Sequence, residues 1–355
     1  MYHGPDQSWV RRPKVMSEEV LRKTVERISE HVAAHDLKKV SVVLHGGEPL
    51  LAGYDLIHSF FSLFSEKLGS KVEFGMQSNL TLLTPEIVTL FSDFHATIGI
   101  SLDGPKSSND KHRLTHSGAS SFDDVIAGLN LLRSTQEGSN VFSGILAVID
   151  PKNDPIEVYE FLRSLKPRGI DFLLPDATHE VLPPHKTSWE ETPYADWLIK
   201  LFDYWWQQSD PVPIRFFENI ITLRLGGVSD NEALGLGSVD ILVIETDGAI
   251  EAVDTLKIDY DGGPHLGLDV FINTIDEAMV HPKISMRTNA EAELSPICSK
   301  CEIVKICGGG YLPHRYSKDA LYRNPSVYCN DLKKLITHVI DVTDRTLQRA
   351  RLVHA

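Results

Sequence analysis

The sequence predicts an α/β fold, in which a parallel β-sheet with interleaved helices over residues 1–230 precedes a smaller domain over residues 231–355. Two observations predict it. First, apolar runs of strand length alternate with amphipathic stretches of helix length, at the spacing of roughly 25–45 residues that is typical of βαβ units in open or barrel-like parallel sheets. Second, this alternation stops before the C-terminal part of the chain, which holds all four cysteines.

The elements of the sheet region can be assigned in order. Ser17 is the expected N-cap of a first helix that ends near Asp36, because the apolar residues between them recur on one helical face. Pro85 marks the first turn of a later helix. The full series after the first helix is strand 40–44, which we expect to be buried, helix 54–68, strand 71–77, a helix from 84, strand 96–102, helix 120–135, strand 141–149, helix 154–166, strand 170–175 and helices 192–208 and 213–225. We place the domain boundary near Asp230.

Small and polar residues follow three successive predicted strands. The segment 45–49 (His-Gly-Gly-Glu-Pro) comes after the first, 77–79 (Gln-Ser-Asn) after the second and 101–105 (Ser-Leu-Asp-Gly-Pro) after the third. Each alone is an ordinary turn sequence. The carboxyl ends of parallel strands, however, meet at one edge of a sheet, where α/β folds bind their ligands. The three segments together therefore predict a shared pocket.

The four cysteines form the arrangement Cys298-x2-Cys301-x5-Cys307 followed by Cys329, with glycines 308–310 directly after the third. Such clustering predicts one metal site with four thiolate ligands. An iron–sulfur cluster and a zinc ion both suit these ligands, and the spacing leaves both open. Two disulfides are the other alternative, but they need an oxidising compartment, and residues 1–30 contain no apolar segment of a secretion signal.

Composition narrows the class of protein. Hydrophobic residues make up 42% of the 355 and charged residues 24%, an ordinary globular balance. The formal net charge of −14 disfavours a nucleic acid partner, because the phosphate backbone is itself negative. No apolar run reaches the length of a membrane span. We therefore expect a cytoplasmic protein that binds neither nucleic acid nor membrane.

Taken together, these motifs resemble the radical SAM superfamily and, within it, the SPASM branch of peptide-modifying maturases. The residues that carry the resemblance are the segment 45–49, Gln77-x-Asn79, Ser101-x-Asp103-Gly-Pro, Arg113, the apolar run 144–149 and the C-terminal cysteines. The resemblance implies a (β/α)6 TIM-like barrel, here partial because its first strand is missing, followed by a small α+β SPASM iron–sulfur domain.

The resemblance also implies where the cofactor binds. In that superfamily the Gly-Gly-Glu-Pro segment binds the amino group of S-adenosyl-L-methionine, and a serine and an arginine at a later strand end bind its carboxylate. Arginine suits this task because its pairing with a carboxylate is bidentate. The residues assigned to cofactor binding in this way are Gly46, Gly47, Glu48, Pro49, Gln77, Asn79, Ser101 and Arg113.

Three further segments, 2–9, 173–179 and 308–316, are similar to the FxsB-like group of radical SAM/SPASM maturases. That likeness implies a ribosomally synthesised precursor peptide as substrate and an external electron donor. It also implies an oxidative side-chain cross-link, such as a three-residue cyclophane, formed through a 5′-deoxyadenosyl radical. A sulfatase-maturase-like enzyme that forms formylglycine is one alternative, and a non-catalytic, metal-bound remnant that binds peptides is another.

The sequence departs from the superfamily pattern at its N-terminal end. Relatives hold the catalytic [4Fe–4S] cluster on a Cys-x3-Cys-x2-Cys loop after the first strand, and the 355 residues contain no such loop. Three thiolates are needed to hold that cluster. We therefore expect the catalytic cluster in a full-length form only, this chain to be inactive as it stands, and strand 40–44 to have an unpaired edge. A start codon assigned too late, a fragment and a degraded gene all fit this departure.

The C-terminal region departs from the SPASM pattern at two positions. Val253 and Tyr311 stand where the family has cysteines that bind an inner auxiliary cluster. Both departures affect the same cluster, whereas the outer auxiliary cluster keeps its full set of ligands. The resemblance thus implies one auxiliary [4Fe–4S] cluster in this chain, with Cys298, Cys301, Cys307 and Cys329 as its ligands.

Asp254 is the expected catalytic residue. It ends a stretch from residue 241 that predicts two short strands around an Asp247-Gly248 turn. In related maturases the matching carboxylate accepts a proton during the oxidation, and coupling of a radical to an aromatic ring requires loss of a proton to restore aromaticity. The alternative is an ordinary solvated carboxylate at a strand end.

Overall fold

The computed structural model describes residues 4–115, 117–229 and 231–353. Residues 2 and 3 of the N-terminal motif and the expected boundary residue Asp230 lie outside these ranges. The elements of the sheet region follow the predicted order, with two added short helices, α4 and α6. The strands are β1 (Val40–Leu44), β2 (Val72–Ser78), β3 (Thr97–Ser101), β4 (Phe142–Val148) and β5 (Ile170–Leu173). The helices are α1 (Glu18–Ala34), α2 (Gly53–Leu68), α3 (Pro85–Asp93), α4 (Lys106–Asn109), α5 (Phe122–Leu132), α6 (Gln136–Val141), α7 (Pro155–Ser164), α8 (Pro193–Trp206) and α9 (Arg215–Arg224).

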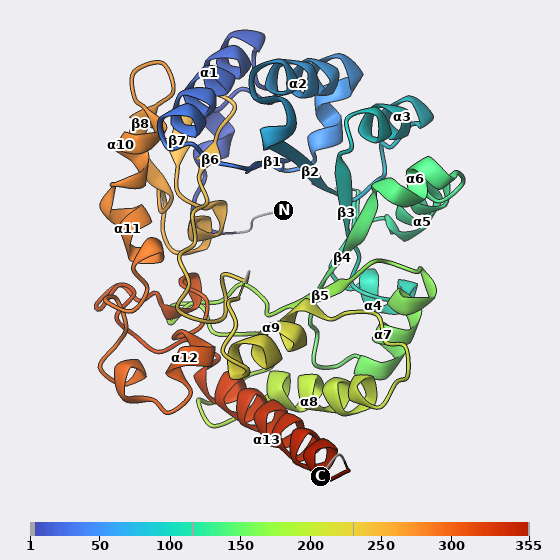
Figure 1. Cartoon of the computed structure of the whole chain (residues 1–355), viewed down its shortest axis with the longest axis vertical. Coiled ribbons are helices and arrows are strands. Elements are labelled where there is room, and N and C mark those ends of the chain that lie inside the picture. Colours follow the sequence, from blue (N-terminus) through green and yellow to red (C-terminus); the bar gives the residue numbers. More distant parts are fainter. Residues whose placement is uncertain (1–3, 116, 230, 354–355) are drawn as a thin grey trace.

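The five strands form one parallel sheet in the order β1-β2-β3-β4-β5. Their carboxyl ends are aligned by the register, in which Leu44 pairs with Met76 and Ser78 with Ile100. The strands follow the inner side of an arc, and the helices that connect them lie on its outer side (Figure 1). This arrangement confirms the predicted parallel α/β sheet of a partial barrel.

The two faces of the sheet differ in the size of their side chains. The face toward the helices carries large buried residues such as Phe74, Met76 and Ile100. Alternate residues of a strand point to the opposite face, and here they are small or polar and only partly buried: Gly75, Gln77, Gly99 and Ser101. Parallel strands that are covered on both faces are apolar throughout. The inner face therefore has the composition of a ligand-contacting surface.

The prediction that strand 40–44 is buried is wrong. Its residues alternate between exposed and partly buried, and the side chain of Val43 is 53% exposed. The reason is its position, because β1 pairs only with β2 and forms the edge of the described sheet. The unpaired edge itself was expected. An apolar composition alone does not distinguish an edge strand from a central one.

The C-terminal region contains a second, antiparallel sheet. The predicted hairpin is confirmed as β6 (Val243–Ile244) and β7 (Ala249–Glu251), joined through the turn at 247–248, and a third strand, β8 (His265–Asp269), pairs with β7. The sheet is followed by α10 (Ile275–Met279), α11 (Pro282–Thr288), α12 (Val304–Cys307) and α13 (Cys329–Val353). These elements lie across from the strands of the first sheet (Figure 1).

The buried apolar residues form two clusters. The smaller one lies under the antiparallel sheet and includes Ile250, Val253 and Leu256. The larger one fills the space between the parallel sheet and its helices, and also takes in Ile306 of α12 and Leu335 of α13. The cysteine-bearing segments thus pack on the core formed by the parallel sheet and its helices. Helix α13 lies along α8 and α9. The division of the chain at residue 230 stays a prediction.

Within the described part of the chain, we find no helix with the length and apolar character of a membrane span.

Candidate functional site

The loop after β1 is fixed by the carboxylate of Glu48. Its Oε1 accepts hydrogen bonds from the hydroxyl of Ser78 at 2.8 Å and from the backbone N–H of Leu50 at 3.0 Å, and its Oε2 accepts one from the backbone N–H of Asn79 at 3.0 Å. Glu48 therefore holds the loop against the carboxyl end of β2. An ionised carboxylate accepts about four hydrogen bonds, so these three leave capacity for a ligand amino group.

The two glycines before Glu48 leave the backbone open. Gly46 has a φ of +94°, which favours glycine at this position. A Cβ atom built at either Gly46 or Gly47 would meet no heavy atom within 4 Å, and both residues are exposed. The loop thus presents backbone N–H and C=O groups that a ligand can approach. Pro49, buried, opens the short helix that follows.

Gln77 and Ser101 meet on the inner face of the sheet. The side-chain amide of Gln77 donates a hydrogen bond to the hydroxyl of Ser101 at 2.9 Å. Gly99 makes this contact possible, because a Cβ atom there would lie 2.3 Å from Oε1 of Gln77. Asn79 differs, since its side-chain oxygen accepts from the backbone N–H and the hydroxyl of Thr81 and so shapes its own turn.

The guanidinium group of Arg113 is held by Asp103. Its Nε and Nη2 donate to the two carboxylate oxygens at 2.6 and 2.9 Å, and Asp103 also accepts from the backbone N–H of Val148 at 2.8 Å. Asp103 is buried, with 6% of its surface exposed. Arg113 is therefore fixed at the ends of β3 and β4, near Ser101. The sequence motif contained Asp103, but its role as the anchor of Arg113 was not predicted.

Asp254 lies beside the loop after β1 although the two are far apart in the sequence. It begins a 3₁₀ helix, Asp254–Ile258, directly after the hairpin, and its Oδ2 is 3.6 Å from Nδ1 of His45. Only 16% of its side chain is exposed, whereas half of the His45 side chain is. The structure thus brings the predicted catalytic carboxylate next to the predicted cofactor loop.

Two further carboxyl groups near Asp254 were missed by sequence reasoning. Burial, and then the charge of Asp254, raise the pKa of Asp176, which lies in the loop after β5. Burial also raises the pKa of Glu232, whose carboxylate pairs with Arg287. Asp176 lies inside the segment 173–179 that carried the family likeness, which was the one available signal. Nothing in the sequence indicated Glu232.

The two positions that lack the expected cysteines are filled by packed side chains. Val253 is buried in the apolar cluster under the antiparallel sheet. Burial, and then the charge of Glu232, raise the pKa of Tyr311 well above its ordinary value. Glu232 and the buried Arg287 thus form an ion pair near Tyr311. This part of the C-terminal region has its own polar contacts in the place where the family pattern has thiolates.

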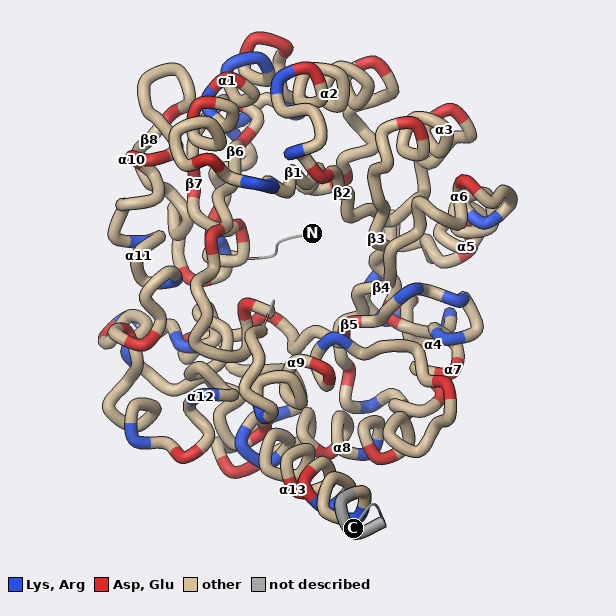
Figure 2. The backbone as a smooth tube through the Cα atoms, viewed as in Figure 1, with Lys and Arg blue, Asp and Glu red and all other residues tan. Residues whose placement is uncertain are grey.

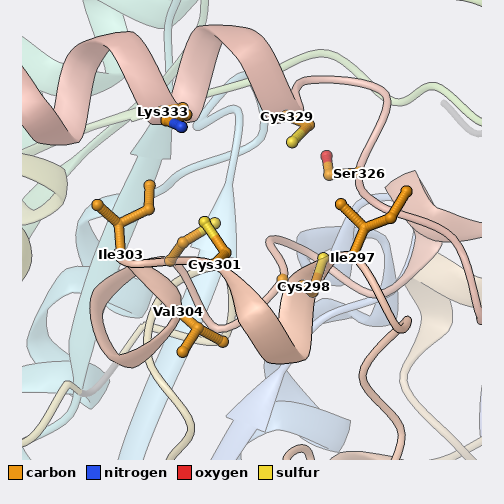
Figure 3. A pocket seen from close by; sticks show the side chains of 10 residues that line it. Ile297, Cys298, Cys301, Ile303, Val304, Ser326, Cys329 and Lys333 are labelled. Atoms are coloured by element: carbon orange, nitrogen blue, oxygen red, sulfur yellow. The ribbon is translucent and has the colours of Figure 1, made fainter.

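The four cysteines surround one cavity. It has a volume of about 40 Å³ and is otherwise lined by apolar side chains, Gly309, Ser326 and Lys333 (Figure 3). Cys298 begins a 3₁₀ helix, Cys301 follows it, Cys307 ends α12 and Cys329 begins α13. Burial, followed by the nearby Cys329, raises the pKa of the Cys307 thiol to about 12. Burial also raises the pKa of Cys329. Metals bind cysteine as the thiolate, so metal binding at this site would release the protons of these thiols.

Three consecutive glycines turn the chain away from Cys307. Gly308, Gly309 and Gly310 have φ values of +64°, +85° and +76°. Space is also limiting, because a Cβ atom at Gly308 would lie 1.8 Å from the carbonyl oxygen of Gly235. The glycines after the third cysteine are therefore required by the backbone of the cysteine site.

The four cysteines can hold either a zinc ion or an iron–sulfur cluster, and the two differ in the spacing of their sulfurs. Four sulfurs around zinc, each about 2.3 Å from it, lie about 3.8 Å apart. In the part of the chain that is described, the group of three or more donors within 4.8 Å of one another consists of His31, His35 and Asp276, and the cysteines form no such group. Each thiolate of a [4Fe–4S] cluster binds a different iron, so its ligands stand farther apart. We find no disulfide among the four cysteines, all of which are free.

The chain is similar to one family profile and to several known proteins. The sequence profile described as Radical SAM superfamily matches residues 7–164. A cysteine-type anaerobic sulfatase-maturating enzyme of Clostridium perfringens (strain 13) is 25% identical over 347 residues, which cover 95% of this chain and 90% of that protein. An uncharacterised protein of Methanothermobacter thermautotrophicus is 30% identical over 212 residues, which cover 58% of this chain and 74% of that protein.

Two solved structures have a similar fold. Native anSMEcpe with bound AdoMet and Kp18Cys peptide matches with a TM-score of 0.79 and 23% identity, over 93% of this chain and 91% of that one. Streptococcus suis SuiB bound to the precursor peptide SuiA matches with a TM-score of 0.56 and 16% identity, over 85% of this chain and 68% of that one.

Proposed function

We propose that this chain, whose residues 7–164 match the profile of the Radical SAM superfamily, binds S-adenosyl-L-methionine at the carboxyl ends of β1 to β3 and oxidises a side chain of a ribosomally synthesised peptide. The observation that carries the proposal is the proximity of Asp254 to His45 of the Gly-Gly-Glu-Pro loop, at 3.6 Å. It joins a carboxylate of the C-terminal region to the loop expected to hold the cofactor.

The residues present fit the cofactor. Glu48 is oriented by three hydrogen bonds and keeps capacity for an amino group, while Gly46 and Gly47 expose their backbone. Arg113, fixed by Asp103, supplies positive charge for a carboxylate. When bound, this cofactor supplies the 5′-deoxyadenosyl radical that removes a hydrogen atom from an unactivated carbon.

Asp254 is proposed to accept the proton that the oxidised side chain releases. A base must lie within reach of the reacting group and must be able to take up a proton. Neighbouring carboxyl groups oppose one another's ionisation, and the charge of Asp254 contributes to the raised pKa of Asp176. Asp254 thus has a second carboxyl group nearby, and the negative charge of one opposes the ionisation of the other.

The predicted product is a cross-link between two side chains of the peptide. The likeness of segments 173–179 and 308–316 to the FxsB-like maturases supports it. Formylglycine is the second candidate, and it is favoured by the similarity to the sulfatase-maturating enzyme of C. perfringens over most of both chains.

The cysteine site is proposed to hold one auxiliary [4Fe–4S] cluster. All four cysteines of the sequence surround the cavity between 298 and 329. No cysteine of these 355 residues therefore remains for a second cluster beside the loop at 45–49. We propose that activity requires a Cys-x3-Cys-x2-Cys segment in addition to these residues and an external electron donor.

Formation of 5′-deoxyadenosine tests the enzymatic part. The 355-residue chain, and the same chain extended at its N-terminus by a Cys-x3-Cys-x2-Cys segment, are reconstituted with iron and sulfide without oxygen and incubated with S-adenosyl-L-methionine and dithionite. We expect 5′-deoxyadenosine from the extended protein and none from the chain alone. No product from an extended protein that carries its added iron would contradict the proposal.

Mass spectrometry of a co-expressed precursor peptide tests the product. A cross-link removes two hydrogens and blocks backbone fragmentation between the joined residues, whereas formylglycine is an aldehyde and reacts with an aminooxy probe. We expect the first pattern. Probe labelling at a cysteine or serine would select the sulfatase-maturase-like reaction instead.

A further inference from the structure

A second group of metal-binding side chains lies away from the cysteines. His31 and His35 stand one turn apart near the end of α1, and Asp276 lies in the first turn of α10. Nδ1 of His31 and Nε2 of His35 both approach the same oxygen of Asp276, at 2.6 and 2.7 Å. The donor atoms of all three residues lie within 4.8 Å of one another. We propose that they bind one divalent transition-metal ion, with zinc as the best fit.

The donor set is the kind that zinc prefers. Two neutral imidazoles and one carboxylate are common zinc ligands, and water completes the coordination of such a three-residue site. The side chains of His35 and Asp276 are 50% exposed and that of His31 is 21% exposed. Water can therefore reach the fourth position. Residues four apart on a helix present their side chains on one face, so the two imidazoles are already arranged side by side.

Only a small movement would admit the ion. Donors bound to zinc in a tetrahedron are about 3.4 Å apart, so each imidazole-to-carboxylate distance would have to open by about 0.7 Å. The planes of the His31 and His35 rings are tilted by 47° and their centroids are 4.6 Å apart, so the two rings are not stacked face to face. Partly exposed side chains at the end of a helix can make this adjustment by small rotations.

The ion would join two distant parts of the chain. His31 and Asp276 are separated by 245 residues, and α1 also contacts the C-terminal region through Arg27, whose Nε donates to the carbonyl of Val270 at 2.8 Å. Helices α1 and α10 lie beside the antiparallel sheet and away from α12 and α13 (Figure 1). The proposed ion is thus a structural brace between α1 and α10 and is independent of the proposed function.

Zinc titration of the iron–sulfur-loaded protein tests the proposal, because the cysteines are then occupied. We expect one zinc bound per chain at micromolar concentration and a rise in Tm on the order of 5 °C at saturation. His35→Ala and Asp276→Asn should each weaken binding by at least tenfold and abolish the rise in Tm. His58→Ala, which removes an exposed histidine of α2, is the matched control and should bind as the parent does.

Two results would overturn the proposal. One is a zinc stoichiometry and Tm shift in His35→Ala and Asp276→Asn that equal those of the parent protein. The other is uptake of zinc only as iron is lost, which would assign the binding to the cysteines. Iron content measured alongside zinc separates these cases, and neither depends on enzymatic activity.

Discussion

At the scale of single residues, the neighbours of Asp254 decide what it can do. The family likeness singled out Asp254 itself, but His45 and Asp176 come from loops after two different strands and reach it only in the folded chain. No spacing in the sequence indicated this grouping. The same holds for Arg113, because its partner Asp103 belonged to a motif that carried the family resemblance, but no role was predicted for it.

Replacing Asp254 should separate radical formation from product formation. In the active, cluster-bearing form, Asp254→Asn removes the proposed proton acceptor and keeps the size of the side chain. We expect peptide modification to fall by about 10²-fold or more while 5′-deoxyadenosine still forms. Product and 5′-deoxyadenosine are measured in the same reaction, with Asp240→Asn, an exposed carboxylate, as control. A parallel fall in both would contradict a role confined to proton transfer.

Asp259 should make stability depend on pH. It is buried, Tyr322 donates a hydrogen bond to it at 2.8 Å, and burial raises its pKa to about 8. The folded protein therefore keeps the proton up to about pH 8, whereas the unfolded chain loses it near pH 4. Since the folded state binds more protons in this range, the free energy of unfolding falls as pH rises from about 4 to 8.

Asp259→Asn should remove that dependence. At pH 6.5 the histidines of the unfolded chain are about half protonated, and they titrate between pH 6.5 and 8 in both proteins, so the difference between the two slopes reports on Asp259. We expect the urea midpoint of the parent to fall over pH 6.5 to 8 relative to that of Asp259→Asn, which makes the variant the more stable protein at pH 8. Equal slopes in the two proteins would show that Asp259 is ionised in the fold.

At the scale of elements, the cysteine site shows how far local sequence reaches. The spacing of the cysteines and the three glycines indicated a metal site, and the positive φ values of residues 308–310 explain the glycines. The 25-residue helix α13, which carries Cys329 at its first position, was not predicted. It is amphipathic, and its apolar face packs against α8 and α9, which are distant from it in the sequence.

Removing one cysteine should remove the metal and destabilise the packing around it. We expect about four irons per chain after anaerobic reconstitution. Cys307→Ala should lose most of this iron and lower the free energy of unfolding by at least about 2 kcal/mol, because a metal that binds only the folded state stabilises it. Iron analysis and urea unfolding check both, with Ser299→Ala as the neighbouring control. About eight irons per chain, or one zinc in place of iron, would contradict a single auxiliary cluster.

At the scale of the whole molecule, the N-terminal segment packs against the antiparallel sheet of the C-terminal region. The segment from residue 4 to 13 lies against the antiparallel sheet, and the guanidinium group of Arg12 pairs with Glu251 and, at 2.9 Å, with Glu245. The side chains of Arg12 and Glu251 are 8% and 2% exposed. Acidic and basic residues elsewhere are spread over both regions (Figure 2). A buried ion pair thus fixes the N-terminal segment to the C-terminal region.

Breaking this pair should weaken the whole protein. Arg12→Met leaves the buried Glu251 with His265, at 3.0 Å, but without its guanidinium partner, and removal of one member of a buried pair costs about 3 kcal/mol or more. We expect that loss in urea unfolding, and faster proteolysis of the N-terminal segment. Arg22→Met, which breaks an exposed pair with Glu18, should cost less than about 1 kcal/mol. Equal costs for the two variants would show that the buried pair adds no special stability.

The sequence by itself determined the order of strands and helices, the polar strand ends and the grouping of the four cysteines, which line one cavity. It did so because side-chain periodicity, turn residues and ligand spacing act over a few neighbouring residues. The tertiary structure decided that β1 is an edge strand, that Asp254 meets the loop after β1, and that α1 and α10 bring His31, His35 and Asp276 together. The first depends on which strands pair, and the other two on residues more than 200 positions apart, and only the packing of the chain fixes these relations.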